Sequence, residues 1–255
     1  MKLYKEWNSI KLRFIVMLLL MVVAAVAIVS LRNFTINLLN SPQMRGYLKN
    51  TPYKGFSMIL KKISSDFSYY SFSQWFGKNY PQLAALVAVI LSFSIFSKEK
   101  EKRTFYVVFG RMNRWEIYSS KMLIGYLSLV TIMLSGSFGY FLTALVFNYH
   151  LSFFMTVSWT VMATVGAALL YQIGAYTSLL FKDQIKPFLL DILIYAGLYI
   201  SGIFKPTKFL DIFNYMAKGN VLRGNGIDVL TTVVICFICL AIFVGEYFQF
   251  KYMDL

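Results

Sequence analysis

Charged side chains are scarce in this chain, and acidic side chains are the scarcest. Only 14% of the 255 residues are charged, with 25 Lys and Arg against 11 Asp and Glu. A soluble domain carries about a quarter charged residues, so this composition argues against a soluble fold. Hydrophobic residues make up 58% of the chain and recur in long uncharged runs. We therefore expect an all-α polytopic membrane protein, because a helix satisfies its backbone polar groups internally in lipid.

Histidine and cysteine are almost absent, which limits metal and redox chemistry. His150 is the only histidine, and Cys236 and Cys239 are the only cysteines. The cysteines have C-x-x-C spacing, but they lie inside an apolar run. A redox or zinc motif needs a polar, accessible setting and, for zinc, further ligands. We expect no metal site and two buried thiols that act as small hydrophobic side chains.

Nucleotide-binding and catalytic motifs are also missing. No G-x-x-x-x-G-K-[ST] sequence occurs. Gly77 and Lys78 come nearest, but Phe72 stands where the leading glycine belongs. Neither H-E-x-x-H nor a Ser/His pair stands out. We expect no catalytic residue, no enzyme activity and no cofactor bound by this chain; if ATP drives its action, ATP and Mg²⁺ bind to a partner subunit.

Six apolar runs are long enough to cross a membrane, and they make residues 1–255 one transmembrane domain. The first run has 18 residues, which form about 27 Å of helix and nearly span the hydrocarbon core. Because the apolar region of a signal peptide has only about 7–15 residues, we interpret this run as a retained span. The predicted spans are 14–31, 79–97, 122–147, 152–181, 187–204 and 228–248.

Basic residues lie mainly between these runs, where they set topology and meet anionic lipid. With both termini in the cytoplasm, the cytoplasmic segments hold 14 basic residues in 49 positions and the external segments hold 11 in 74. This density favours cytoplasmic termini. It also accounts for the net charge of +14 without a nucleic-acid partner.

Segment 32–78 is too long for a simple turn, and we expect a small extracellular loop subdomain there. Apolar residues recur in it at helical spacing, which predicts a helix near 54–68. These residues are Phe56, Ile59, Leu60, Ile63 and Phe67.

The N-terminal segment is amphipathic. Trp7, Ile10 and Phe14 fall on one helical face, and the basic residues lie off it. Such a helix rests in the membrane interface with its cationic side toward lipid phosphates. We expect a dedicated interfacial helix, and the alternative is a simple topology anchor.

Residues 98–121, called the connector here, join the second and third predicted spans. Charges of both signs precede Phe105, Phe109 and Trp115, which recur at helical spacing. A membrane surface favours mainly positive charge, whereas mixed charge beside an apolar stripe suits a soluble protein partner. The alternative is a solvated loop that only sets topology.

The connector resembles the signature of permease subunits in the second class of ABC exporters, which export drugs, polysaccharides, lipids or peptides. That signature contains an acidic residue, a Gly-Thr pair, aliphatic residues, a Pro-x-Ser-Arg-like turn, an Ile and a Lys that opens span three. Three positions depart from it: Arg103 replaces the glycine, Arg111 the proline, and Ser120 the small residue before the lysine. The matching positions are Glu101, Thr104, Phe105 to Phe109, Arg114, Ile117 and Lys121.

This resemblance implies that the matching residues, together with Trp115, couple the chain to an ATPase. It implies two cytosolic ABC ATPase subunits as partners and a second permease subunit, in the simplest case as a homodimer. It also implies a multi-pass location in the bacterial cytoplasmic membrane, with both termini cytoplasmic. The enlarged segment 32–78 departs from the simplest members and is similar to permeases that export phenol-soluble modulins.

The family also has an external segment that dips into the membrane before its last span. Segment 205–227 fits a short interfacial or re-entrant helix of this kind, with glycine hinges. The apolar residues expected on one face are Phe209, Ile212, Phe213 and Met216, followed by Gly219, Gly224 and Gly226.

Two acidic residues fall inside predicted spans. Asp191 lies four residues after Pro187, and Glu246 lies near the end of the last span. An Asp at mid-bilayer costs about 2.5–3.5 kcal/mol on insertion scales. We expect Lys186 or Lys182 to pair with Asp191 and fix the helix end, and the alternative is a role in gating.

The favoured function is the membrane-spanning permease of an ATP-driven exporter whose substrate is amphipathic or hydrophobic, most simply a peptide. Intramembrane charges are few, and the spans are rich in Phe, Tyr, Met and Leu, which suit an adaptable apolar surface. The alternatives are a self-protection permease that clears antimicrobial peptides, a polysaccharide or lipid exporter, and a non-transporting membrane scaffold. An intramembrane enzyme is disfavoured, because no acid/base or metal constellation is present.

Overall fold

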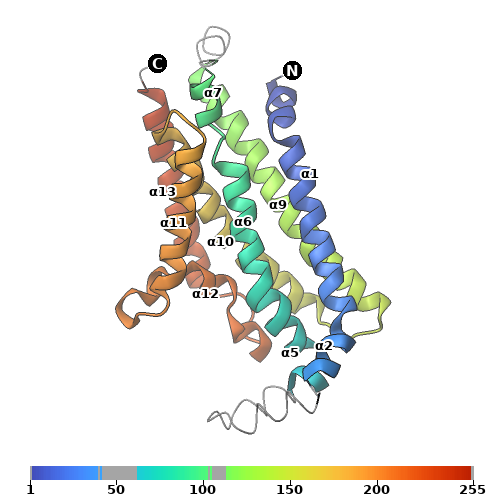
Figure 1. Cartoon of the computed structure of the whole chain (residues 1–255). Coiled ribbons are helices and arrows are strands. Elements are labelled where there is room, and N and C mark those ends of the chain that lie inside the picture. The colour runs from blue at the N-terminus through green and yellow to red at the C-terminus, as the bar shows by residue number, and fades with distance from the viewer. Residues whose placement is uncertain (1, 40, 42–61, 103, 105–112, 254–255) are drawn as a thin grey trace.

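The computed structural model describes residues 2–39, 41, 62–102, 104 and 113–253. These residues contain helices and no strand, so the all-α prediction is confirmed. The long helices run side by side as one bundle (Figure 1). They are α1 (Lys2–Ser30), α6 (Tyr80–Ser92), α9 (Arg114–Val146), α10 (Phe153–Leu180), α11 (Ile185–Ser201) and α13 (Val229–Lys251).

Five helical segments in the described part of the chain are long and apolar enough to cross a membrane. They are Tyr4–Ser30, Phe67–Glu101, Arg114–Val146, Phe153–Leu180 and Val229–Lys251. The remaining predicted span, 187–204, corresponds to α11, which has 17 residues. At 1.5 Å per residue α11 is about 26 Å long, at the lower limit for a crossing. The chain therefore has the helices of a membrane protein, and the sixth span stays a prediction.

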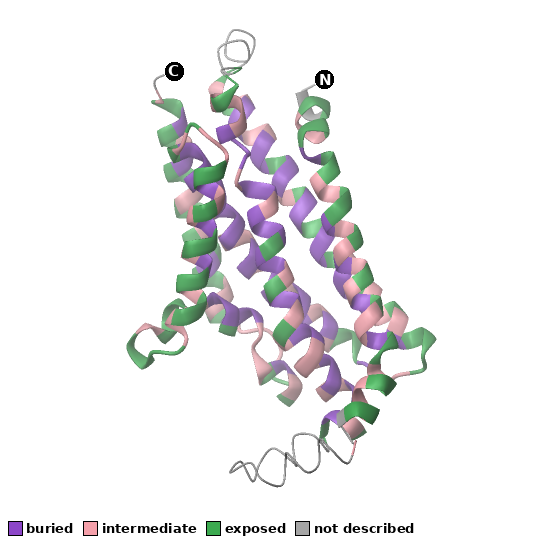
Figure 2. Cartoon of the chain, viewed as in Figure 1, coloured by how far each residue is buried: buried purple, intermediate pink, exposed green. Residues whose placement is uncertain are grey.

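The N-terminal segment and the first predicted span form one continuous helix, so the expectation of a separate interfacial helix is wrong. Residues 2–30 contain no glycine or proline that would end a helix between them. One face of α1 packs along α9, and its outer face is exposed (Figure 2). The buried face contains Ile10, Met17, Met21, Ala25 and Val29.

The second membrane-length segment begins earlier than the predicted span 79–97. It starts with α5 (Phe67–Ser71), continues through the π-helix η1 (Phe72–Asn79) into α6, turns at 93–96, and ends in α7 (Ser97–Glu101). Aromatic side chains explain the early start, because they pack inside the bundle. Trp75 stacks on Tyr140 with ring centroids 5.7 Å apart, and Phe76 stacks on Trp159 at 4.7 Å.

The predicted loop subdomain 32–78 therefore ends earlier than expected, and residues 40 and 42–61 of it lie outside the described part of the chain. Its first part forms α2 (Arg32–Leu39). The helix predicted near 54–68 is described only from residue 62, where 62–65 are helical and Asp66 interrupts the helix. The subdomain itself stays a prediction.

The third and fourth predicted spans form the expected hairpin. α9 begins at Arg114, eight residues before the predicted span, so it includes the end of the connector. α10 matches the prediction and lies centrally, in contact with α6, α9, α11 and α13. Asn148 turns the link between them with a φ of 56°, a left-handed conformation that Asn tolerates.

Segment 205–227 forms three short helices: η2 (Lys205–Leu210), α12 (Ile212–Met216) and η3 (Gly219–Arg223). Ile212, Phe213 and Met216 are buried, but Phe209 is 82% exposed. The single predicted face is therefore wrong at Phe209, because a 3₁₀-helix ends before Asp211 and changes the helical register. Gly224 and Gly226 have positive φ, a conformation that glycine adopts readily, whereas Gly219 does not, and the hinge role stays a prediction.

Candidate functional site

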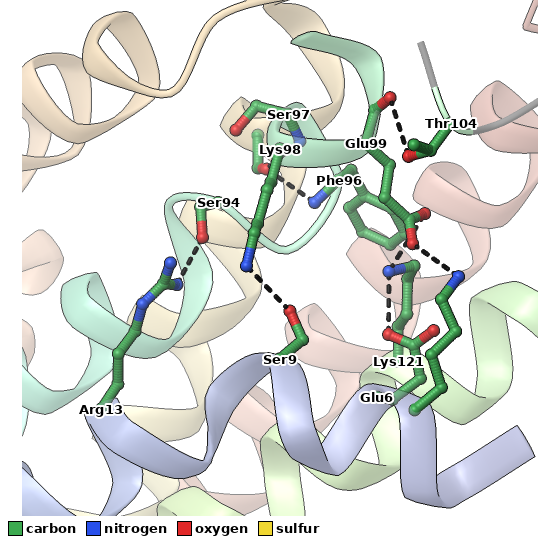
Figure 3. Close-up of polar contacts among 12 residues, drawn as sticks. Glu6, Ser9, Arg13, Ser94, Phe96, Ser97, Lys98, Glu99, Thr104 and Lys121 are labelled. Carbon is green, nitrogen blue, oxygen red and sulfur yellow. Dashed lines mark hydrogen bonds and ion pairs between the residues drawn. The ribbon is translucent and has the colours of Figure 1, made fainter. Parts of the chain in front are cut away.

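Four charged side chains gather at the end of the bundle where both termini lie (Figures 1 and 3). We call Lys5, Glu6, Glu99 and Lys121 the ionic cluster. Lys121 Nζ lies 2.9 Å from Glu6 Oε2 and 3.2 Å from Glu99 Oε2. Lys5 Nζ lies 3.3 Å from Glu99 Oε1. The cluster therefore joins α1 to both ends of the connector.

Lys121 is the buried centre of this cluster, with only 5% of its surface exposed. A buried ammonium is tolerated when opposite charges surround it, and here two carboxylates do so. Removing one partner of a buried ion pair costs about 3–5 kcal/mol, because it leaves an uncompensated charge. The cluster carries two positive and two negative charges, so its members neutralise one another.

Hydrogen bonds extend this link between α1 and the chain that leads into the connector. Lys98 Nζ donates to Ser9 Oγ at 3.4 Å. The Arg13 guanidinium donates to Ser94 Oγ and lies 4.7 Å from the centre of the Phe93 ring. On the other side, the Phe96 amide donates to Ser178 Oγ of α10 at 3.0 Å. The turn at 93–96 is thus held by α1 and α10 together.

The predicted coupling residues at the start of the connector lie at the exposed end of the bundle. The Glu101 carboxylate accepts a hydrogen bond from Gln184 Nε2 at 2.6 Å. Thr104 is exposed, and its amide donates to the Glu99 carbonyl at 3.0 Å. Phe105 and Phe109 lie outside the described residues. Glu101 and Thr104 therefore remain available to a partner at this end.

The predicted coupling residues at the end of the connector all belong to α9. Arg114 donates from Nη1 to the carbonyls of Phe250, Lys251 and Met253, so it caps the end of α13. Trp115 is 48% exposed and meets the edge of Tyr247 at 4.7 Å. The two remaining residues, Ile117 and Lys121, are buried inside the bundle.

The predicted interfacial residues Trp7, Ile10 and Phe14 occupy the side of α1 near α9. The Trp7 and Phe14 rings meet edge to face at 5.1 Å, and Ile10 is 8% exposed. Trp7 and Phe14 line a hollow of about 210 Å³ together with Ile124 and Leu127 of α9. Within the bundle these residues thus contact α9, and their interfacial role stays a prediction.

The predicted ion pair of Asp191 is wrong. Asp191 is fully buried, and its Oδ1 accepts a hydrogen bond from Thr177 Oγ1 of α10 at 2.6 Å. Lys186 pairs instead with Asp183, at 3.2 Å. Five residues separate Lys186 from Asp191, which turns them about 140° apart around the helix. The lysine therefore faces outward while the carboxylate faces α10.

A second buried carboxylate has partners that sequence analysis missed. Glu246 is fully buried in α13, and its Oε2 accepts a hydrogen bond from Tyr118 Oη at 2.9 Å and another from Gln172 Nε2. Tyr126 Oη in turn donates to Gln172 Oε1. Gln172 in the middle of an apolar run was the available signal, because an amide buried in lipid needs a polar partner.

The described part of the chain contains no cluster of acidic, histidine or cysteine side chains that could bind a metal ion. No three His, Cys, Asp or Glu side chains come together there. Cys239 is partly buried, but Cys236 is exposed on α13, so the prediction of two buried thiols is wrong for Cys236. It lies on the outer surface of the bundle, where a small apolar side chain suits lipid.

The ionic cluster and the two buried carboxylates thus lie within a bundle of membrane-length helices. Comparison of this chain with protein-family models, curated protein sequences and solved structures gives no match.

Proposed function

We propose that this chain is the membrane-spanning permease subunit of an ATP-driven exporter. The observation that carries the proposal is the ionic cluster, in which Lys121 joins Glu99 at the start of the connector to Glu6 of α1. The connector is also the segment that resembles the permease signature. A load applied to it by a soluble partner would reach α1, α7 and α9 at once, because buried ion pairs break only at high cost.

The proposed arrangement has six spans, with α11 as the fifth. Both termini and α7 lie at one end of the bundle, as an even number of crossings requires (Figure 1). Two such subunits, in the simplest case identical, would form the pathway, and two cytosolic ATPases would dock beneath it. Closure of the ATPases on ATP would move the connector and shift the spans between two packed states.

The proposed substrate is amphipathic or hydrophobic, most simply a peptide. Two hollows on the outer face, of about 320 and 360 Å³, share Tyr126 and Phe243 between them. The larger hollow lies among α9, α10 and α13 and includes Ala168, Cys236 and Leu240. Such a lining favours an apolar molecule that arrives from the bilayer over a sugar or an ion.

The test of the proposal is purification of the tagged chain from its own host in mild detergent. We expect a subunit that carries a G-x-x-x-x-G-K-[ST] motif to co-purify, and ATP hydrolysis by the complex to respond to the chain. Glu101→Lys and Trp115→Ala should weaken ATPase binding by about 30-fold each, as loss of an interface hot spot of about 2 kcal/mol does. Insertion of both variants in the membrane should be unchanged.

Lys121→Met separates docking from coupling, because Lys121 is buried away from the bundle surface. This variant should still bind the ATPase but lose most transport. The matched control is Lys186→Met, which breaks a lysine–carboxylate pair of the same 3.2 Å length at an exposed position. The proposal would be contradicted if no ATP-hydrolysing partner were found, or if all three connector variants transported at the wild-type rate. A non-transporting membrane scaffold would then be the better interpretation.

The substrate class has its own test. Cells that lack the chain and its ATPase are compared with wild type for export of hydrophobic peptides and of lipid-linked glycans. Reduced peptide secretion or lower peptide tolerance supports the peptide assignment. Unchanged peptide handling with glycan retained inside the cell would replace it with polysaccharide export.

A further inference from the structure

Among the described residues, no Lys or Arg side chain forms an ion pair with Asp191. The helices packed against its side of α11 are α6, α10 and α12, and none of them contains a charged residue. η2 packs against the other end of α11, and its two lysines are exposed. An ionised carboxylate left alone in such surroundings costs several kcal/mol. A bound cation or a proton would therefore stabilise Asp191 by neutralising its charge.

One oxygen of the Asp191 carboxylate accepts a hydrogen bond, and the other has no hydrogen-bond partner among the described residues. Oδ1 accepts from Thr177 Oγ1 at 2.6 Å. Oδ2 is buried and has no hydrogen-bond partner among the described residues. Tyr195, the other titratable group on this face of α11, donates to the Leu170 carbonyl at 2.5 Å and so does not serve Asp191. The free oxygen is thus the feature that remains to be explained.

Gly174 of α10 brings a second side-chain oxygen to the same place. A Cβ atom at residue 174 would lie 2.1 Å from Ser92 Oγ and 3.1 Å from Asp191 Oδ2. Both oxygens therefore pack close to the backbone of Gly174, where any larger residue would clash with Ser92. Thr177 lies one turn further along the same helix. Carboxylate and hydroxyl oxygens are hard ligands, which small hard cations prefer.

The chain beside this point is an interrupted helix. α6 ends at Ser92, and the segment turns at 93–96 before α7 continues toward the end of the bundle. Amides of Phe96 and Ser97 donate to Ser178 Oγ, at 3.0 Å each, instead of to helix carbonyls. Broken helices in membrane proteins place backbone dipoles and carbonyl groups where coupling ions bind.

We infer that Asp191, Ser92 and Thr177 form a binding site for one small monovalent cation, Na⁺ or a proton. One carboxylate carries one negative charge, so a monovalent ligand leaves the site neutral, whereas a divalent ion would leave a net charge in a dry interior. This site is separate from ATP-driven coupling through the connector, and it would operate whether or not an ATPase binds. It gives Asp191 a role in binding rather than in fixing a helix end.

The test uses the purified full chain in lipid nanodiscs and dicyclohexylcarbodiimide, an apolar reagent that modifies protonated carboxyl groups. Modification of Asp191 is followed by peptide mass spectrometry. If the ligand is a proton, the rate falls about tenfold per pH unit once the carboxyl ionises, and Na⁺ has no effect. If the ligand is Na⁺, replacing choline by Na⁺ at fixed pH and ionic strength lowers the rate at least several-fold.

Thr177→Val is the matched variant, because it keeps the side-chain shape and removes the hydroxyl. It should shift the Na⁺ or pH midpoint by about tenfold in concentration, the effect of losing one hydrogen bond to a charged group. Melting of the wild-type protein in Na⁺ and choline at several pH values gives a second measurement that needs no variant. Two outcomes would overturn the inference. In the first, neither the labelling rate nor the melting temperature changes with Na⁺ or pH. In the second, Asp191 is not labelled at all and the melting temperature does not change with Na⁺ or pH.

Discussion

Asp228 caps the first turn of α13 and also binds a lysine. Its carboxylate accepts hydrogen bonds from the Thr231 amide at 3.4 Å, from Thr231 Oγ1 at 2.6 Å and from Lys218 Nζ. The Lys218 hydrogen bond, followed by those from Thr231, lowers the pKa of the Asp228 carboxyl. Because the folded pKa lies below the unfolded value, the contact stabilises the folded state above the unfolded pKa. This stabilisation is lost as pH falls through the folded pKa.

We predict that Lys218→Met lowers the melting temperature at neutral pH and loses this effect in acid. The difference from wild type should be constant above about pH 5 and should shrink below about pH 4, where the carboxyl of the unfolded chain becomes protonated. The measurement is thermal unfolding of the purified protein in detergent as a function of pH. Lys205→Met, at an exposed lysine of η2, is the control and should match wild type throughout.

Asp228→Ala removes the cap as well as the ion pair. It should cost about 1 kcal/mol, a typical value for loss of an N-cap. Its effect at neutral pH should therefore exceed that of Lys218→Met. A pH-independent difference for Lys218→Met would show that the lysine acts by packing alone.

At the scale of helices, the close contact of α9 with α10 depends on Gly125. A Cβ atom on Gly125 would lie 1.8 Å from the hydroxyl oxygen and 2.6 Å from Cζ of Tyr171, which is fully buried. The phenol ring of Tyr171 is rigid, so α9 and α10 would have to separate to admit even a methyl group. Gly197 of α11 is the natural comparison, because nothing lies within 4 Å of its Cβ position.

We predict that Gly125→Ala destabilises the protein and that Gly197→Ala does not. Overpacking costs about 1–3 kcal/mol, partly offset by the helix preference of Ala over Gly, about 0.5–1 kcal/mol. Gly197→Ala gains the helix preference of Ala without overpacking, so it should be neutral or slightly stabilising. Thermal unfolding of both variants under identical conditions measures the difference. Equal melting temperatures would contradict the close packing of α9 on α10.

Helix ends with a local cause could be predicted from the sequence, and ends that depend on packing could not. Predicted span 152–181 agrees with α10 (Phe153–Leu180), which follows the tight link after α9. α9 begins eight residues before its predicted span because Ile117 and Lys121 find burial and ion pairs inside the bundle. No periodicity in the connector indicates that its last turns are buried.

The candidate site was predictable to a similar extent. The signature resemblance singled out Lys121, but its partner Glu6 is 115 residues away in the sequence, and Glu99 lies at the other end of the connector. Their pairing depends on how α1 lies along α9. For Asp191 the sequence indicated a wrong partner that is close along the chain. Lys186 is only five residues away, but the helix places the two side chains on different faces, and Asp191 binds Thr177 instead.

For the whole molecule, the common position of the two chain ends makes topology testable with two sites. In a background with Cys236→Ser and Cys239→Ser, we predict that Ser64→Cys reacts with an impermeant maleimide in intact cells. Asn113→Cys should react only after the membrane is permeabilised. The reason is that α9, which Asn113 directly precedes, starts at the end of the bundle shared with both termini, and basic residues favour the cytoplasm there (Figure 1). The reverse labelling pattern would invert the orientation.

The central position of α10 also has a consequence for how the protein is made. α10 precedes α11 and α13 in the chain, so Thr177 and Gln172 are synthesised before Asp191 and Glu246, whose carboxylates they bind in the folded bundle. An isolated Asp at mid-bilayer costs about 2.5–3.5 kcal/mol on insertion scales, and a waiting polar partner reduces that cost. In the proposed six-span arrangement, α11 and α13 would therefore enter the bilayer after the helix that holds their hydrogen-bond donors. We expect this order of synthesis to lower the free-energy cost of inserting the two acidic helices.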